Sequence, residues 1–178
     1  MKSLNTTANK LTMLRILMIP IFMVLLYGGK GTAALIVYII ACLTDALDGY
    51  IARHYDQVTD FGKLVDPLAD KVLVMAALCI YVETGKMPGW ALAVVILREF
   101  AVSGLRMIAL EKGKVIAAAR SGKIKTGVTM VSICIMMISD MLFPGKGDLC
   151  DIICVILILI VTVISGIDYF YTNRKLIN

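Results

Sequence analysis

Six apolar stretches divide the chain, and short polar segments rich in glycine separate most of them. The stretches cover residues 11–27, 32–50, 63–82, 90–110, 126–143 and 151–171. Each is close to the roughly 20 residues that an α-helix needs to cross a bilayer. We therefore expect an all-α membrane protein with six transmembrane helices. The polar start of the first stretch predicts an N-terminal segment that lies along the membrane interface.

Composition agrees with this pattern. Hydrophobic residues make up 60% of the chain, against about 45–50% apolar residues in soluble domains. We expect a single membrane domain over residues 1–178, embedded in the lipid bilayer. The five cysteines form no Cys-x-x-Cys pair, and we interpret them as small packing residues. The net charge of +5 is modest and no nucleic-acid motif is present, so no nucleic-acid partner is expected.

The distribution of basic residues predicts the orientation in the membrane. A chain with six spans has both termini on the same side of the membrane. The second and fourth connections between spans lie on that side as well. That side would hold Lys2, Lys10, Arg53, Lys63, Lys112, Lys114, Arg120, Lys123, Lys125, Arg174 and Lys175, and the other side only Lys30, Lys86 and Lys146. Because positive residues favour the cytoplasm, we expect cytoplasmic termini in the cell membrane.

Four aspartates between the second and third stretches suggest a metal site at this cytoplasmic face. Asp45 and Asp48 are three residues apart, and Asp66 and Asp70 are four apart, so each pair shares one face of its helix. The polar loop 54–61 lets the two helices fold back on each other, which would bring all four acids together. Pairing with nearby arginine and lysine side chains is the alternative interpretation.

Such a cluster needs a counter-charge, because each aspartate inside a membrane costs roughly 3 kcal/mol. Carboxylate oxygens prefer hard cations, so we expect Mg²⁺, with Mn²⁺ or Ca²⁺ as substitutes. Two carboxylate pairs fit two ions about 4 Å apart, an arrangement that binds phosphoryl groups. The small residues Gly49, Ala52 and Gly62 leave room for a large substrate beside the acids.

The same residues carry a resemblance to a known family. The pattern Asp-x-x-Asp-Gly-x-x-Ala-Arg-x8-Gly-x-x-x-Asp-x-x-x-Asp is similar to the signature of the CDP-alcohol phosphatidyltransferases. The resemblance implies that Asp45, Asp48 and Asp66 bind metal and that Asp70 is the general base and a neighbour of the second metal. It also implies contacts to the CDP-lipid from a second set of residues. These are Gly49, Ala52 and Arg53, together with Asn9, Thr12 and Thr59.

Basic residues on the later stretches suggest an anion site. An arginine inside a span needs a buried partner, which for Arg98 and Arg106 could be Glu99, Asp168 or a substrate phosphate. The strings around these arginines and around 111–126 resemble the bacterial phosphatidylglycerophosphate synthases. That resemblance implies CDP-diacylglycerol as donor, glycerol 3-phosphate as acceptor and a homodimer. The acceptor phosphate would then bind some of Arg98, Arg106, Arg120, Lys123 and Lys125.

Other functions remain open from the sequence alone. A sister enzyme could use inositol phosphate, serine or phosphatidylglycerol as acceptor. A basic pocket favours a phosphorylated acceptor but does not distinguish glycerol phosphate from inositol phosphate. A cation or proton transporter could also place aspartates among helices. Its site would usually lie near the membrane midplane, whereas these acids lie at one face. A purely structural membrane protein would have little reason to group four acids in this way.

Overall fold

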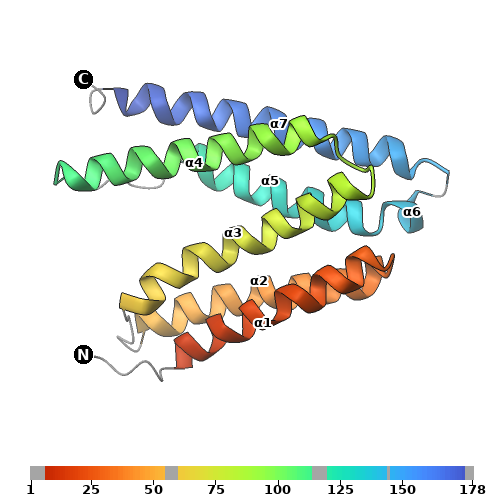
Figure 1. Ribbon diagram of the computed structural model, residues 1–178, viewed down its shortest axis with the longest axis horizontal. Coiled ribbons are helices and arrows are strands. Elements are labelled where there is room, and N and C mark those ends of the chain that lie inside the picture. The colour runs from red at the N-terminus through yellow and green to blue at the C-terminus, as the bar shows by residue number, and fades with distance from the viewer. Residues whose placement is uncertain (1–6, 55–59, 114–119, 144, 175–178) are drawn as a thin grey trace. The chain divides into compact units, whose positions relative to one another are not determined.

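The structure is a computed structural model that describes residues 7–54, 60–113, 120–143 and 145–174. Within these ranges, side chains are described for residues 13–44, 71–113, 120–143 and 145–174. The described chain is helical throughout its regular elements (Figure 1), as the sequence predicts. It forms two compact units, Met1–Tyr81 and Val82–Asn178. The prediction of a single domain over 1–178 stays a prediction.

The first unit contains the paired helices α1 (Thr7–Tyr27) and α2 (Gly31–His54). They run antiparallel (Figure 1), and a tight turn joins them in which Gly29 has a φ of 71°, a conformation that glycine adopts without strain. The rings of Phe22 and Tyr38 are 5.6 Å apart between centroids, and both side chains are buried. This aromatic contact fixes the two helices against each other.

The helix α3 (Asp60–Glu83) begins only a few residues after α2 ends. Within the first unit, the carboxyl end of α2 and the amino end of α3 lie at the same end (Figure 1). The expected loop 54–61 is therefore shorter than predicted. Because α3 begins at Asp60 and not at residue 63, where the third apolar stretch begins, Pro67 lies beyond the first turn of the helix. The carbonyl of Lys63 consequently lacks the N–H that another residue at 67 would donate.

The second unit contains α4 (Gly89–Glu111), α5 (Arg120–Met137), the short α6 (Ser139–Leu142) and α7 (Gly147–Thr172). The helix α7 packs against each of the other three. Its buried positions recur every three or four residues, as expected of one helix face. They are Gly147, Asp151, Cys154, Val155, Ile158, Thr162, Ser165 and Tyr169. Tyr169 forms a hydrophobic cluster with Val102 and Leu105 of α4.

The fifth apolar stretch differs from its prediction at both ends. A helix over 126–143 was expected, but α5 starts at Arg120 and ends at Met137, and a separate turn of helix follows. The polar connection expected to run to residue 125 is shorter, because its last residues are helical. The break after α5 is stabilised by the hydroxyl of Ser139, which donates a hydrogen bond to the carbonyl of Met136 at 3.2 Å.

Lys86 joins three parts of the second unit at the end where α7 begins. Its Nζ atom lies 2.9 Å from Oδ2 of Asp151 and 3.3 Å from Oδ2 of Asp140. It also donates hydrogen bonds to the hydroxyl of Ser139 and the carbonyl of Met136. Burial alone would lower the pKa of Lys86, but its hydrogen bond to Asp151 and the charges of both aspartates outweigh burial and raise the pKa above 10.5.

Within the part of the chain that the structure describes, α7 is the one helix long and apolar enough by itself to cross a membrane. Two shorter apolar segments, Met13–Tyr27 and Gly31–Thr44, lie in α1 and α2. The helix α4 carries Arg98, Glu99 and Arg106 along its length, so its membrane placement depends on how these charges are neutralised. Six spans and cytoplasmic termini stay predictions.

Candidate functional site

The four motif aspartates occupy the helical positions that the sequence predicts. Asp45 and Asp48 lie near the carboxyl end of α2, and Asp66 and Asp70 lie in the amino-terminal half of α3. Both segments are helical, so offsets of three and four residues are compatible with each pair sharing a helix face, which stays a prediction. The side chains of all four acids lie outside the described residues, so their convergence stays a prediction.

The predicted CDP-lipid residues belong mostly to the same two helices. Gly49, Ala52 and Arg53 follow the first pair of acids on the last turns of α2. Asn9 and Thr12 lie in the first turns of α1. Thr59 lies outside the described residues.

A metal site at the motif depends on the chemistry of its donors. Among the side chains that the structure describes, no group of three or more histidine, cysteine, aspartate or glutamate residues could hold a metal ion. The motif acids are not in that set. Their four carboxylates form an all-oxygen donor set, which fits a hard divalent cation such as Mg²⁺. The donor chemistry is therefore compatible with the predicted ions.

The second unit holds a compact ionic cluster that joins α4 to α5. One oxygen of Glu99, Oε1, accepts hydrogen bonds from NH1 of Arg98 and from Nζ of Lys125, each at 2.8 Å. The three side chains are only 12%, 16% and 6% exposed for Arg98, Glu99 and Lys125. The NH2 atom of Arg98 donates to the hydroxyl of Ser165, which connects the cluster to α7. We call Arg98, Glu99 and Lys125 the ionic cluster.

The ionic cluster carries one net positive charge in a buried, polar setting. Two cations share one carboxylate, so one charge is left over. The buried polar atoms of the second unit that have no hydrogen-bond partner among the described residues include Nε of Arg98 and the hydroxyls of Thr129 and Thr162. Buried polar groups are normally satisfied by protein, water or ligand. An anion beside Arg98 would supply both a counter-charge for the cluster and an acceptor for the Nε atom.

Arg106 makes a different set of contacts, with an aromatic residue of α7. Its Nε atom donates a hydrogen bond to the hydroxyl of Tyr169 at 2.9 Å, and its guanidinium carbon lies 5.6 Å from the centre of that ring. Tyr169 is buried, whereas Arg106 is exposed. The ring therefore holds the arginine in one orientation. The hydrogen bond uses Nε, so the two terminal nitrogens, which can form a bidentate fork, take no part in it.

The predicted basic residues thus fall into different environments. Arg98 and Lys125 are brought together by Glu99, while Arg106 is held by Tyr169. Arg120 and Lys123 lie exposed on the first turn of α5. Of the two acids considered as partners of Arg98, Glu99 is confirmed. Asp168 instead accepts a hydrogen bond from the hydroxyl of Ser121.

Two contacting residues of α7 were missed from the sequence, Ser165 and Tyr169. The signal that could have found them is their spacing. They are four residues apart, and Thr162 precedes Ser165 by three, so all three polar side chains lie on the buried face of an otherwise apolar helix.

Comparison with known proteins decides the family. The model of the CDP-alcohol phosphatidyltransferase family matches residues 5–167 of the chain. The chain belongs to this family. The motif and both basic sites lie inside the matched region.

Several similar proteins carry more specific names. The CDP-diacylglycerol–glycerol-3-phosphate 3-phosphatidyltransferase of Bacillus subtilis (strain 168) is 39% identical over 180 residues, covering 93% of each chain. A probable phosphatidylglycerophosphate synthase of Mycobacterium tuberculosis (strain CDC 1551 / Oshkosh) is 37% identical and covers 91% of this chain and 78% of its own. The CDP-diacylglycerol–glycerol-3-phosphate 3-phosphatidyltransferase of Rickettsia felis is 34% identical and covers 94% of each chain.

Proposed function

We propose that this member of the family transfers the phosphatidyl group of CDP-diacylglycerol to sn-glycerol 3-phosphate, which yields phosphatidylglycerophosphate and CMP. The observation that carries the proposal is the helical register of the motif acids on α2 and α3. It occurs in a chain that aligns over most of its length with relatives named for this reaction. The enzyme is a transferase of phospholipid biosynthesis.

The donor substrate is a lipid, so the protein acts in the cell membrane. We propose six spans, with both termini and the motif at the cytoplasmic face. The apolar length of α7 and the shorter apolar segments of α1 and α2 support this placement. So does the ionic cluster, because pairing with Glu99 lowers the cost of keeping Arg98 and Lys125 within the membrane. The assembly is a homodimer.

Asp45, Asp48 and Asp66 hold the divalent cations in this proposal, with Asp70 beside the second ion. Two bound Mg²⁺ ions would supply electrostatic stabilisation to the pyrophosphate of the donor. Gly49 and Ala52 leave room on α2 for the cytidine group. Arg53 binds a donor phosphate, and Asn9, Thr12 and Thr59 contribute further contacts to the CDP-lipid.

The acceptor phosphate binds the basic residues of the second unit. The ionic cluster offers a net positive charge and one unsatisfied donor, Nε of Arg98, and Arg106 is oriented by Tyr169. Guanidinium groups match phosphate oxygens geometrically, which favours Arg98 and Arg106. Arg120, Lys123 and Lys125 add positive charge from the first turns of α5.

The reaction is an in-line displacement at phosphorus. Asp70 accepts the proton of the acceptor's 1-hydroxyl, and the oxygen forms a bond to the lipid-bearing phosphorus. The bond between that phosphorus and the CMP oxygen breaks, and CMP leaves. Because an aspartate is a weak base for an alcohol, positioning of the acceptor by the basic residues carries much of the catalysis.

Release of CMP by the purified protein tests the proposal. CDP-diacylglycerol and Mg²⁺ are supplied in detergent, and glycerol 3-phosphate, inositol phosphate, serine and phosphatidylglycerol are offered separately. We expect CMP only with glycerol 3-phosphate, and none from Asp70→Asn or with EDTA. Turnover with another acceptor would overturn the substrate but keep the reaction class. A folded protein without turnover on any acceptor would reject the transferase, and cation uptake in vesicles would then support a transporter.

A further inference from the structure

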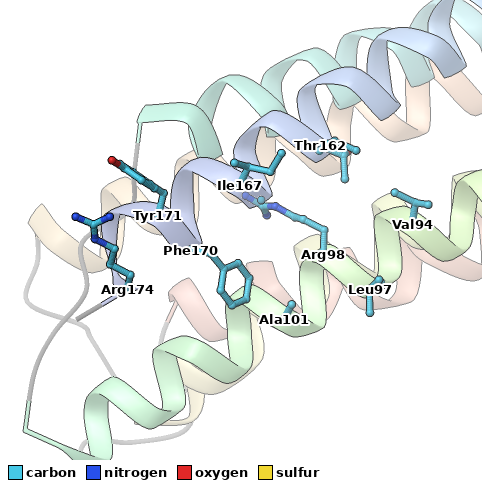
Figure 2. Close-up of a pocket in the computed structure, with 11 residues that line it drawn as sticks. Val94, Leu97, Arg98, Ala101, Thr162, Ile167, Phe170, Tyr171 and Arg174 are labelled. Carbon is cyan, nitrogen blue, oxygen red and sulfur yellow. The ribbon is translucent and has the colours of Figure 1, made fainter. Parts of the chain in front are cut away.

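A groove of about 550 Å³ runs between α4 and α7 in the second unit (Figure 2). This volume lies within the roughly 300–1,000 Å³ of typical ligand sites. Its α4 wall includes Val94, Leu97 and Ala101, and its α7 wall includes Val163, Ile167 and Phe170. The walls are therefore mainly apolar, and none of these residues belongs to the acid motif.

One arginine of the ionic cluster also borders the groove, but only with its stem. A Cβ atom at Gly166 would lie 3.4 Å from Cγ of Arg98, so the aliphatic part of Arg98 lies against α7 at this glycine. Its guanidinium is bound to Glu99 and Ser165. Arg98 therefore presents its aliphatic stem to the groove, and the middle of the groove offers hydrocarbon contacts.

A second arginine stands at the carboxyl end of the groove. Arg174 is exposed and lies just after the last turn of α7, where its guanidinium carbon is 4.8 Å from the centre of the Tyr171 ring. Figure 2 shows both side chains at this end, beyond Phe170 and Ile167. Stacking on the ring restrains the arginine and leaves its donors available to an anion. Tyrosine is also typical of the membrane–water interface.

The length of the groove matches one leaflet of a bilayer. From Thr162 to its last residue, Thr172, the helix α7 rises by about 15 Å, at 1.5 Å per residue. Half of the hydrocarbon core of a bilayer is about 15 Å. An acyl chain that starts beside Arg174 would therefore end near Thr162, at the middle of the membrane.

We propose that the groove between α4 and α7 binds one acyl chain of an anionic phospholipid that is not a substrate, with the lipid phosphate held by Arg174. Basic sites between transmembrane helices at the cytoplasmic face favour anionic head groups. A zwitterionic lipid could fill the same apolar walls but would gain less from the arginine. The proposal rests on the membrane placement of α4 and α7, and not on the reaction.

Native mass spectrometry of the full-length protein tests this site. The protein is mixed with equal amounts of phosphatidylglycerol and phosphatidylcholine that carry identical acyl chains, and retained lipids are counted per protomer. We expect phosphatidylglycerol to exceed phosphatidylcholine by about fivefold, the effect of one arginine near a charged head group. Arg174→Gln should remove this preference, whereas Lys112→Gln, at an exposed lysine that ends α4, should keep it.

A second pair of variants tests the apolar walls. Ala101→Phe fills the groove and should remove the retained phosphatidylglycerol. Ala93→Phe adds the same ring at an exposed position of α4 that does not line the groove, and should leave retention unchanged. If Ala101→Phe fails to fold, the comparison of Arg174→Gln with Lys112→Gln decides alone.

Three results would overturn the proposal. An unchanged lipid ratio in Arg174→Gln would show that the arginine does not select the head group. Loss of a dimer mass in Ala101→Phe, with lipid retention intact, would show that a second copy covers the groove. A raised KM for CDP-diacylglycerol in Arg174→Gln would assign the groove to the donor substrate. Absence of CMP release in every variant and the wild type would reject the proposed reaction and leave the lipid ratios interpretable.

Discussion

Nζ of Lys125 lies 2.8 Å from Oε1 of Glu99, although 26 residues separate the two in the chain. The same oxygen accepts a hydrogen bond from Arg98. Glu99 is therefore the shared anion of two buried cations on two different helices. Its removal would leave the cations facing each other with no carboxylate between them.

The variant Glu99→Gln tests how much this arrangement contributes to the stability of the folded protein. Breaking a buried ion pair by removing one partner typically costs about 3 kcal/mol, because the remaining charge is uncompensated. We expect the free energy of unfolding to fall by about that amount, seen as an earlier thermal transition by circular dichroism in detergent. Glu111→Gln, at the exposed last residue of α4, is the matched control and should not shift the transition. Equal transitions for both variants would contradict the shared-anion interpretation.

The contact between Arg106 and Tyr169 predicts an effect on acceptor affinity. Tyr169→Phe keeps the ring and removes the hydroxyl that orients the arginine. A hydrogen bond contributes about 1 kcal/mol, so KM for glycerol 3-phosphate should rise about fivefold with little change in kcat. Arg106→Ala should raise it further, and adding Tyr169→Phe to that variant should have no further effect, since the tyrosine acts through the arginine.

Tyr171→Phe is the control for this series, because Tyr171 is exposed and contacts Arg174 through its ring. Its KM for glycerol 3-phosphate should equal that of the wild type. Additive effects of Arg106→Ala and Tyr169→Phe would show that the tyrosine does not act by orienting the arginine.

The ion pairs of Lys86 should make the stability of the folded protein depend on pH. Its pKa is raised in the folded protein, so the ion pair with Asp151 contributes fully below about pH 10.5 and is lost as the pH rises through the folded-state pKa. We expect the midpoint temperature of thermal unfolding of the wild type to decrease as the pH rises above about 10.5. Lys86→Met should unfold at a lower temperature than the wild type already at pH 8. Its transition temperature should not show the additional decrease at alkaline pH.

The size of the Lys86→Met effect follows from its partner. The side chain of Asp151 is only 3% exposed, and an uncompensated buried carboxylate costs about 3 kcal/mol. Lys146→Met, at an exposed lysine just before α7, is the control. A transition of Lys86→Met that matches this control at pH 8 would reject the structural role of the ion pair.

We predict that the activity depends on a divalent cation bound by the motif acids. Activity should disappear on chelation with EDTA and return with excess Mg²⁺. Asp48→Asn should raise the Mg²⁺ concentration for half-maximal CMP release by at least about tenfold, because it removes one proposed carboxylate ligand. Asp148→Asn, at an exposed aspartate in the first turn of α7, should leave the Mg²⁺ requirement unchanged. Full activity of Asp48→Asn at the wild-type Mg²⁺ concentration would reject its role as a ligand.

Local pattern predicted the helices well, because apolar length and glycine-rich turns are properties of neighbouring residues. The start of α5 was missed for a reason that is not local. Arg120, Lys123 and Lys125 read as a charged connection, but Lys125 turns into the protein and its charge is offset by Glu99. Only the packing of distant helices makes a buried lysine acceptable at this position.

In the candidate site too, local features could be predicted from the sequence, whereas contacts between distant helices could not. The offsets of the aspartates predicted their shared helix faces, since the register within a helix is fixed by its geometry. The pairing of Arg98 with Glu99 was also predictable from adjacent residues. The sharing of Glu99 with Lys125 and the contact of Arg106 with Tyr169 were not, because they depend on how α4 meets α5 and α7.

The ion pair between Lys86 and Asp151 also has a consequence for the biogenesis of the protein. Lys86 precedes α4, whereas Asp151 belongs to the first turns of α7, so α4, α5 and α6 are all synthesised between the two partners. Until α7 emerges, the lysine lacks this partner, and until the helices assemble, the aspartate carries an unpaired charge. Closing this pair therefore marks the completion of the second unit, and in a chain truncated before α7 the lysine would keep only Asp140 of its two acidic partners.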